Sequence, residues 1–457
     1  MSDSLLSHTH NLNDQSSLTE WLDYMQQIHV SAIDMGLSRV LPVAELLGVV
    51  QSAKDDAYVF TVAGTNGKGS TTAAIAQMCQ AAGHKTALYQ SPHLSVFNER
   101  VRINGEMVSD QTLINAFSKV EAARLKCALT LSFFEMTTLA ALLIFAEADC
   151  DVWVLEVGLG GRLDVVNIID PDMAVITNIG IDHVDWLGDN VEAIGAEKAG
   201  ILREGITLVY GTREMPTSVQ RAIDKHEAIC YQFGQDFSYR EIDSKTWQYS
   251  NAAVTMQLPR PALSLTNTAN ALSAVLASSL NIDTPAIEKA LQTVKLAGRF
   301  DYREVKNRQW LFDVAHNEHG VTFLLKQLLP LWQQHLANPT KSSQAMDSQT
   351  SRAPATIKML FSMLGDKDIG KVVQRLTEAG LPISDWFIAE IDYPRAASTE
   401  HLRSVLANYV NDGQIHEFKR LSEATYAVIN ASQPQDLIVV CGSFHTIGEA
   451  LAAIEMG

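Results

Sequence analysis

A glycine-rich turn early in the chain constrains the fold more than any other feature. Residues 59–62 form an apolar, β-branched run, residues 64–70 read Gly-Thr-Asn-Gly-Lys-Gly-Ser, and an alanine-rich segment begins at Ala73. This order predicts a strand, a tight turn and the start of a helix. Glycines let successive N–H groups point at one anion, and the helix start adds partial positive charge. We therefore predict that this turn binds a polyphosphate.

The spacing of the turn differs from the common P-loop pattern, which has four residues between its first glycine and the Gly-Lys pair. Here two residues separate Gly64 from Gly67, and Gly69 stands between Lys68 and Ser70. The alternative is a strand-to-helix turn that binds nothing. Phosphate binding is the better interpretation, because the strand, the lysine charge and the hydroxyls able to reach Mg²⁺ follow in the correct order.

Composition excludes several classes of protein. A chain of 457 residues with 47% hydrophobic and 19% charged residues is typical of a globular protein with two or three domains. The net charge of −17 argues against a nucleic-acid partner, and binding an anion such as ATP requires local positive charge or divalent metal. No run of about 18 apolar residues predicts a membrane span, and residues 1–18 lack the layout of a signal peptide.

The five cysteines are scattered and odd in number, which argues against a disulfide framework or a zinc site. We expect inert buried thiols in a cytoplasmic protein. They are Cys79, Cys127, Cys150, Cys230 and Cys441.

Short apolar runs alternate with helical patterns, which predicts an α/β fold with mostly parallel sheets. An asparagine-rich helix start at 267–270 leads into a helical pattern through Leu291, and we place a domain boundary at about residue 298. The expected domains are 1–297 and 298–457, and residues 338–356 are expected to form a solvated loop. The predicted strands are 59–62, 85–89, 151–155, 174–177 and 207–210 in the first domain, and 310–314, 357–361, 386–391 and 437–440 in the second.

Polar residues that follow these strands are the first candidates for a site, because ligands of such sheets bind beyond the carboxyl ends of the strands. Glu156 ends one strand and is a natural partner for nucleotide-bound Mg²⁺, although a surface loop carboxylate is the alternative. Ser91 follows another strand and offers a hydroxyl ligand, or forms an ordinary Ser-Pro turn.

Two further residues are ambiguous on chemical grounds. His183 follows the strand at 174–177 and could reach the same cation, yet neutral imidazole is an unusual Mg²⁺ ligand. Lys198 lies in a helical segment of small residues, where a lysine is ordinarily a solvated surface charge.

Nine motifs occur in order between about residue 20 and about residue 450. They are Thr-Val-Ala-Gly-Thr-Asn-Gly-Lys-Gly-Ser at 61–70, Ser-Pro-His-Leu at 91–94, Leu-Glu-Val-Gly-Leu-Gly-Gly-Arg-Leu-Asp at 155–164, Asp-His at 182–183, Glu-Lys-Ala-Gly-Ile at 197–201, Gly-Arg-Phe at 298–300, Phe-Asp-Val-Ala-His-Asn at 312–317, Gly-Asp-Lys-Asp-Ile at 365–369 and Cys-Gly-Ser-Phe-His-Thr at 441–446. Together they closely resemble the folylpolyglutamate synthases, within the wider group of amide ligases that includes the Mur ligases. The resemblance also accounts for the shortened spacing of the turn.

The resemblance implies an ATP-dependent ligase of two domains, an N-terminal P-loop ATPase-type sheet and a smaller C-terminal Rossmann-like α/β domain. It implies two Mg²⁺ sites, one formed through a carbamate on Lys198, and it leaves a need for a monovalent cation open. The implied ATP-binding residues are Thr65, Asn66, Gly67, Lys68, Gly69, Ser70, Asn267, Arg299 and Asp313, and the implied metal ligands are Ser91, Glu156, His183 and Lys198.

Some members of the family only extend folates, whereas bifunctional bacterial members also add the first glutamate to dihydropteroate. Three segments resemble the pterin-contacting segments of the bifunctional type, with Ser132 where Thr is expected. By resemblance the substrates are dihydropteroate, reduced folates and L-glutamate, and the protein is a monomer. The implied pterin-binding residues are Ile33, Asp34, Met35, Ser132, Phe134, Leu163, Asp164 and Val165, and the glutamate-side candidates are His316 and Ser443.

Three alternatives stay open at this point. The chain could be a folylpolyglutamate synthase only, or a Mur-type ligase, although we expect no domain for a uridine nucleotide before the turn at Gly64. A nucleotide-binding switch without turnover is the alternative from another class. The candidate metal ligands and the full second domain argue against that switch.

Overall fold

The computed structural model describes residues 12–29, 34–337 and 354–456. The chain divides into two compact units. The first contains Met1–His93 and Phe97–Val294, and the second contains Leu94–Val96 and Lys295–Gly457. The division between residues 294 and 295 lies close to the boundary expected at 298, but the assignment of residues 94–96 to the second unit was not predicted.

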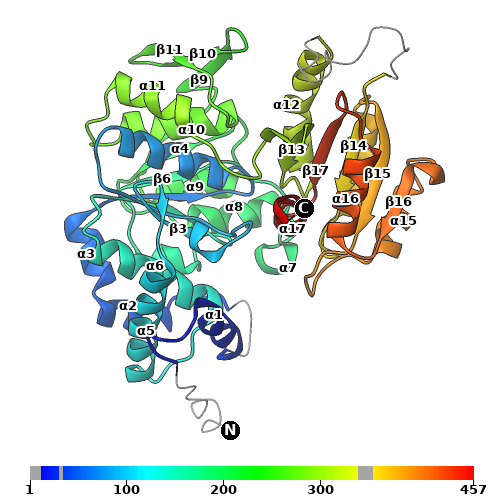
Figure 1. Ribbon diagram of the computed structural model, residues 1–457. Helices are drawn as coiled ribbons and strands as arrows, with labels where there is room; N and C mark the ends of the chain where they lie inside the picture. Colours follow the sequence, from blue (N-terminus) through cyan, green and yellow to red (C-terminus); the bar gives the residue numbers. More distant parts are fainter. Residues whose placement is uncertain (1–11, 30–33, 338–353, 457) are drawn as a thin grey trace. The chain divides into compact units, whose positions relative to one another are not determined.

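The first unit is built on one eight-stranded sheet, drawn in Figure 1. Its strands are β1 (Tyr58–Ala63), β2 (Thr86–Tyr89), β3 (Val101–Ile103), β4 (Glu106–Met107), β5 (Val152–Glu156), β6 (Met173–Ile176), β7 (Thr207–Tyr210) and β8 (Ile229–Gln232). Their order is β4-β3-β2-β5-β1-β6-β7-β8. Six of these strands run parallel, and β3 and β4 continue the sheet antiparallel beside β2. The carboxyl ends of β2, β5, β1 and β6 therefore meet at one edge.

Helices cover this sheet because its central strands are apolar on both faces. One hydrophobic core contains Trp153 and Leu155 of β5 together with residues of the helices that pack on them. Helix α4 packs against α10 and α11. The helices of the unit are α1 (Leu18–Gln27), α2 (Val40–Leu47), α3 (Val49–Asp56), α4 (Lys68–Ala81), α5 (Asp110–Lys126), α6 (Phe133–Glu147), α7 (Val184–Leu187), α8 (Val191–Ala199), α9 (Thr217–Lys225), α10 (Leu265–Ala277) and α11 (Thr284–Thr293), with short 3-10 turns η1 (Phe97–Arg100) and η2 (Val165–Ile168).

The helical pattern predicted between residues 267 and 291 is two helices, which corrects the sequence interpretation. The first helix, α10, ends at Ala277, and α11 begins at Thr284. Asp283 caps the second helix by accepting the N–H of Ala286 at 2.9 Å, and a proline stands in its first turn. An acidic cap followed by proline starts a new helix, and this signal was present in the sequence.

A small antiparallel sheet was not predicted. It contains β9 (Phe237–Glu241), β10 (Thr246–Asn251) and β11 (Thr255–Pro259), in the order β11-β10-β9. Trp247 and Tyr249 of β10 are fully buried, whereas most other positions of the three strands are polar. These strands alternate apolar and polar residues over only five or six positions and lack the continuous apolar runs from which the other strands were predicted.

The second unit holds a six-stranded sheet in the order β12-β13-β17-β14-β15-β16, with only β12 antiparallel. The core on one face takes residues from α12, α14 and α15, and the core on the other face takes residues from α16 and α17. The strands are β12 (Asp301–Val305), β13 (Arg308–Asp313), β14 (Ile357–Phe361), β15 (Ile383–Ala389), β16 (Ile415–Phe418) and β17 (Leu437–Cys441). The helices are α12 (Glu318–Ala337), α14 (Ile369–Glu378), α15 (Thr399–Leu406), α16 (Leu421–Ala431) and α17 (Phe444–Met456), with a 3-10 turn η3 (Asp412–Gln414).

The predicted fold class is confirmed, and each of the nine predicted strands is present, two with the predicted bounds (β7 and β14) and seven with ends shifted by one to three residues. All five cysteines are free thiols, of which Cys127 and Cys230 are only half-buried rather than buried as expected. Among the described helices, none is both long and apolar enough to cross a membrane. The expected solvated loop at 338–356 lies almost entirely outside the described residues.

Replacing Leu139 by alanine tests the packing of α6 in the first unit. Leu139 is fully buried in the core around β5, so Leu139→Ala should lower the free energy of unfolding by about 2–5 kcal/mol. Leu125 of α5 is 43% exposed, and Leu125→Ala should change it by less than about 0.5 kcal/mol. Urea titration followed by circular dichroism measures both, and equal effects of the two substitutions would contradict the assigned core.

Candidate active site

The glycine-rich turn lies between β1 and α4, and β6 holds it in place. The Thr65 N–H donates to the carbonyl of Asn178 at 3.0 Å, and the Asn66 N–H donates to Asn178 Oδ1 at 3.0 Å. Asn178 Nδ2 and Thr177 Oγ1 both donate to the carbonyl of Asn66, at 2.8 and 2.7 Å. These bonds pair the backbone groups of Thr65 and Asn66 with the segment that follows β6, and they fix the shape of the turn before a ligand binds.

Two glycines are required by space as well as by backbone angle. At Gly64 (φ +149°) an added Cβ would lie 1.8 Å from Thr177 Oγ1. At Gly67 (φ +86°), which precedes α4, it would lie 2.4 Å from Asn267 Oδ1 on α10. Asn267, an implied ATP-binding residue, therefore lies directly against the turn. The structure brings the two together although they are 200 residues apart.

Lys68 folds over the turn that precedes it. Its Nζ donates to the carbonyl of Gly64 at 3.0 Å. Gly69 and Ser70 follow in the first turn of α4, where the N–H groups have no partner within the helix. A lysine charge and these N–H groups together suit the phosphates of a nucleotide.

The candidate metal ligands of the first unit lie at the same edge of the sheet as the turn. Glu156 is the last residue of β5 and is buried, so it is not the surface carboxylate that was the alternative. Ser91 follows β2, and β2 and β1 both pair with β5. His183 follows β6 and is exposed, with a left-handed backbone angle (φ +51°) at the start of α7.

The donor chemistry of this edge fits a magnesium ion shared with a nucleotide. Among residues 12–29, 34–337 and 354–456, no three His, Cys, Asp or Glu side chains group closely enough to hold a metal. Mg²⁺ keeps several waters and is bound through one or two carboxylates plus phosphate oxygens, so a dedicated protein cage is not required. Glu156 and the Ser91 hydroxyl supply oxygen ligands. Two further oxygen atoms are buried without a hydrogen-bond partner among the described residues: Thr71 Oγ1, next to Ser70 in the sequence, and Glu197 Oε2, next to Lys198.

Lys198 is buried, in contrast to the solvated charge that its place on a helix suggested. Its side chain is 4% exposed within α8. Burial, and after it the charge of Lys68, lower its pKa to about 7, although Asp182 and Asp164 oppose this shift. Near pH 8 the amine is therefore largely neutral, which is the form that reacts with carbon dioxide.

Two of the implied pterin residues, Phe134 and Met35, lie against the loop at 158–164. The Phe134 ring covers Gly158, where an added Cβ would lie 2.4 Å from its Cζ, and Met35 Cε lies 3.6 Å from the corresponding position at Gly160. The same loop packs on α8, because the Arg162 N–H donates to the carbonyl of Glu197 at 2.8 Å. Leu163 and Val165 belong to this loop and to η2, and Ile33 lies outside the described residues.

Asp164 organises that loop from within. Its carboxylate accepts the N–H groups of Leu159 at 2.8 Å and Val166 at 2.9 Å. Burial raises its pKa to about 6, although these backbone bonds favour the ionised form. Ser132 has a comparable local role, since it caps α6 in a reciprocal pair with Glu135. Both side chains therefore hold local backbone structure, Asp164 that of the loop and Ser132 that of the start of α6.

A chain of ion pairs joins the remaining pterin candidate, Asp34, to α6. Asp34 pairs with Arg39 Nη2 at 2.9 Å, and the same nitrogen pairs with Glu135 Oε1 at 2.9 Å. His29 Nε2 lies 3.1 Å from Asp34 Oδ2. Sequence reasoning missed the pairing of Arg39 with Glu135, because no spacing rule joins residues 96 positions apart. It also missed His29 and Arg39, which lie only five positions from Asp34.

The candidates of the second unit form a group of their own at the carboxyl end of β13. Asp313 accepts the N–H groups of Phe300 at 2.8 Å and Ala315 at 2.9 Å. Burial raises the pKa of Asp313, and the charge of Arg299 opposes the rise. Arg299 lies over the Phe444 ring at 4.9 Å, and His316 Nδ1 lies 2.8 Å from the carbonyl of Val314. Ser443 is buried and caps the N–H of Thr446 at 3.0 Å, so it starts α17.

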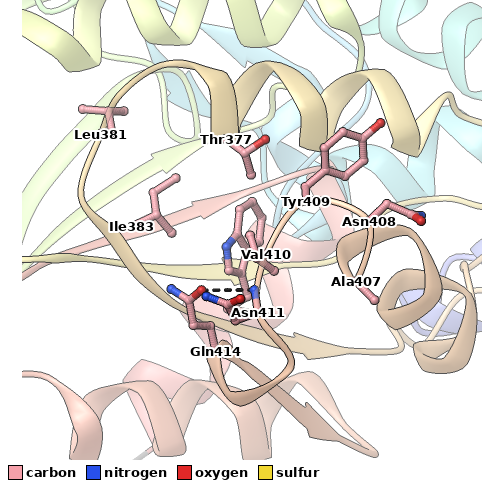
Figure 2. Close-up of a pocket in the computed structure, with 10 residues that line it drawn as sticks. Thr377, Leu381, Ile383, Ala407, Asn408, Tyr409, Val410, Asn411 and Gln414 are labelled. Atoms are coloured by element: carbon pink, nitrogen blue, oxygen red, sulfur yellow. Dashed lines mark hydrogen bonds between the residues drawn. The ribbon is translucent and has the colours of Figure 1, made fainter.

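A cavity of about 410 Å³ in the second unit is separate from these candidates (Figure 2). It lies among the end of α14, the start of β15 and the segment that follows α15, and its lining includes Leu381, Asn408 and Gln414. The bond drawn in Figure 2 runs from the Asn411 N–H to Gln414 Oε1 at 3.2 Å. No predicted site residue lines this cavity, so we do not assign it to the ligand site.

Comparisons with known proteins decide the family. The Mur ligase middle domain matches residues 62–278, and the Mur ligase glutamate ligase domain matches residues 337–444. The dihydrofolate synthase/folylpolyglutamate synthase of Escherichia coli is 37% identical over 96% of both chains, and that of Haemophilus influenzae is 33% identical over 97% of this chain and 99% of the relative. The chain belongs to the dihydrofolate synthase/folylpolyglutamate synthase family.

Solved members of this family share the fold over nearly the whole length. An Escherichia coli structure in complex with DHPP and ADP superposes with a TM-score of 0.86 at 36% identity, covering 97% of this chain and 99% of that one. A Yersinia pestis structure complexed with AMPPNP and a manganese ion has a TM-score of 0.85 at 35% identity, with the same coverage. The resemblance inferred from nine short motifs is therefore confirmed.

Replacing Gly67 by alanine tests the close packing of the turn against Asn267. Gly67→Ala adds a Cβ where Asn267 Oδ1 lies, so affinity for an ATP analogue should fall by about tenfold or more. Gly83→Ala is the matched control, because Gly83 (φ +95°) has a similar backbone angle and nothing within 4 Å. Titration calorimetry measures both, and unchanged affinity for Gly67→Ala would contradict the assigned nucleotide site.

Proposed function

We propose that this chain is an ATP-dependent carboxylate–amine ligase that adds L-glutamate to dihydropteroate, forming dihydrofolate, and to the γ-carboxylate of reduced folates. One observation carries this proposal. The charges of Lys68 in the nucleotide turn, Asp164 in the pterin loop and Asp182 beside His183 all act on the buried Lys198 amine. Residues implied for nucleotide, pterin and metal therefore lie within electrostatic reach of one another in the first unit.

A carboxylate does not react with an amine unaided, which is why the reaction uses ATP. The acceptor carboxylate oxygen attacks the γ-phosphorus, an O–P bond forms, and the bond from the γ-phosphorus to the ADP oxygen breaks. The resulting acyl phosphate is attacked by the amino group of L-glutamate, which forms the amide and releases phosphate and a proton. Lys68 and the N–H groups of the turn hold the phosphates and neutralise charge that develops on them.

We assign the nucleotide and the metal to named residues of this chain. Thr65, Asn66, Gly67, Lys68 and Asn267 would contact ATP in the first unit, and Arg299 and Asp313 in the second. Ser91, Glu156 and His183 would hold one Mg²⁺, and a carbamate on Lys198 would help to hold the other; bound metal supplies positive charge beside the phosphates. Relatives solved with ADP, with AMPPNP and manganese, and with L-glutamate support nucleotide, divalent metal and glutamate as ligands.

His316 and Ser443 are proposed for the glutamate side of the reaction. His316 lies just beyond the carboxyl end of β13, and Ser443 lies two residues after β17, the strand paired with β13. Ser443 already caps α17, so it offers ligands the start of that helix as well as its hydroxyl. We further propose that the protein acts in the cytoplasm as a monomer on small molecules, and its net charge of −17 supports the exclusion of nucleic acid.

Release of ADP with defined acceptors tests the function. Purified protein with ATP, Mg²⁺ and L-glutamate should release ADP with dihydropteroate and also with tetrahydrofolate, and Lys68→Ala should abolish both. Turnover with tetrahydrofolate alone would restrict the protein to folate extension. Turnover only with a nucleotide-linked muramyl peptide would make it a Mur-type ligase, and no turnover with any acceptor would favour a nucleotide-binding switch.

Labelling with ¹³C-bicarbonate tests the carbamate on Lys198. The neutral lysine nitrogen attacks carbon dioxide, a C–N bond forms, and the nitrogen loses a proton to solvent. We expect a protein carbamate ¹³C resonance near pH 8 that is lost in Lys198→Gln. Lys225→Gln removes an exposed lysine at the end of α9 and should keep the signal. A spectrum without a carbamate resonance in the unsubstituted protein would refute this assignment.

A further inference from the structure

Arg100 is a partly buried cation that none of the assigned roles uses. It is the last residue of η1 and leads directly into β3. Its guanidinium lies over the Phe97 ring at 5.3 Å and over the Phe133 ring at 5.9 Å. Phe133 stands between Ser132 and Phe134, two of the implied pterin-binding residues. Arg100 therefore borders the pterin side of the first unit.

The same guanidinium is also within electrostatic reach of Glu156, a candidate metal ligand. The carboxylates of Glu156 and Glu99 and the hydroxyl of Tyr89 act on it electrostatically, and burial lowers its pKa in spite of them. Tyr89 Oη is already engaged with Thr138 Oγ1 at 2.8 Å. Arg100 thus lies beside Phe133 of the pterin segment and within electrostatic reach of Glu156, the carboxylate assigned to magnesium.

The hydrogen bonds of Arg100 leave its fork available. Nε donates to His93 Nδ1 at 2.9 Å, so that ring nitrogen carries no proton. Within the described part of the chain, Arg100 forms no ion pair, and its side-chain hydrogen-bond partners are His93 and the Tyr89 hydroxyl. Burying a guanidinium without an anion is costly, and its planar fork matches a carboxylate through two parallel bonds.

We propose that Arg100 binds the acceptor carboxylate of the substrate and positions it for attack on the γ-phosphorus. This inference rests on the proposed function. Dihydropteroate carries its carboxylate at the end opposite the pterin ring, so a substrate whose ring lies at the 158–164 loop must direct its carboxylate away from that loop. A cation beside Phe133 and within electrostatic reach of Glu156 offers that carboxylate a partner in the unit that also holds the nucleotide turn.

The alternative is a purely structural role, in which Arg100 holds His93 and the segment after Ser91 in place. The Arg100 carbonyl accepts the Gln90 N–H at 3.0 Å, so the backbone already ties the two segments together without the side chain. A structural arginine would affect every ligand of the site equally. An arginine that binds the carboxylate affects only ligands that carry one.

Paired ligands separate these two roles. The first is 7,8-dihydropteroate, and the second is its decarboxylated analogue, which keeps the pterin and the anilino ring. In the presence of AMPPNP and Mg²⁺, the unsubstituted protein should bind dihydropteroate about 10- to 100-fold more tightly than the analogue. Arg100→Met should bind both ligands equally and should keep the affinity of the unsubstituted protein for the analogue.

Two further variants complete the experiment, which is read by titration calorimetry. Arg102→Met is the matched control, because Arg102 lies two residues away on β3 and donates to the carbonyls of Glu99 and Gly105; it should keep the full preference. Arg100→Lys keeps the charge without the fork and should keep only part of the preference, which is informative even if Arg100→Met does not fold.

Two results would overturn the Arg100 inference, and a third would overturn the proposed function. A full preference for the carboxylate in Arg100→Met shows that Arg100 does not bind that group. An equal loss of affinity for both ligands in Arg100→Met and Arg100→Lys assigns the arginine a structural role. If the unsubstituted protein binds neither ligand, the proposed function fails, and this outcome is distinct from failure of the Arg100 inference.

Discussion

The loop between β1 and α4 can follow its course only because residues 64 and 67 have no Cβ. Thr177 at the end of β6 and Asn267 on α10 occupy the space that a side chain would need. Thr177 and Asn178 then supply the hydrogen bonds that hold the loop from behind. The shape of the nucleotide turn is therefore a property of three elements packed together, and it depends on β1 lying next to β6.

The same strand order gathers the remaining chemistry. Because β1 lies between β5 and β6 in a parallel sheet, Glu156 at the end of β5 and the segment after β6 meet the turn at one edge. Three basic side chains of the first unit are fully or partly buried: Lys198 fully, and Lys68 and Arg100 partly. Burial lowers the pKa of Lys198 and Arg100. The charges of Lys68 and Arg100 are available to phosphate and carboxylate groups in an otherwise acidic protein, whereas the Lys198 amine is largely neutral near pH 8.

Much of this arrangement could be predicted from local sequence. Apolar runs predicted the central strands, since a strand buried on both faces needs no long-range information to be recognised. Polar edge strands such as β9 and β11 lacked that signal, and the break between α10 and α11 was missed although Asp283 and the proline after it mark a helix start. Residues at strand ends, Glu156 and Ser91, were found by the rule that ligands bind beyond the carboxyl ends of strands. The burial of Lys198 and the pairing of Arg39 with Glu135 depend on tertiary packing, and no local pattern reports it.

The central claim is that the turn preceding α4 grips a nucleotide polyphosphate together with a divalent cation held at adjacent strand ends. Titration calorimetry of the purified protein with AMPPNP, in the presence and absence of Mg²⁺, tests this claim most directly. We expect binding that requires Mg²⁺ and that Lys68→Ala abolishes. Purified, folded protein that shows no magnesium-dependent affinity for AMPPNP would contradict the account.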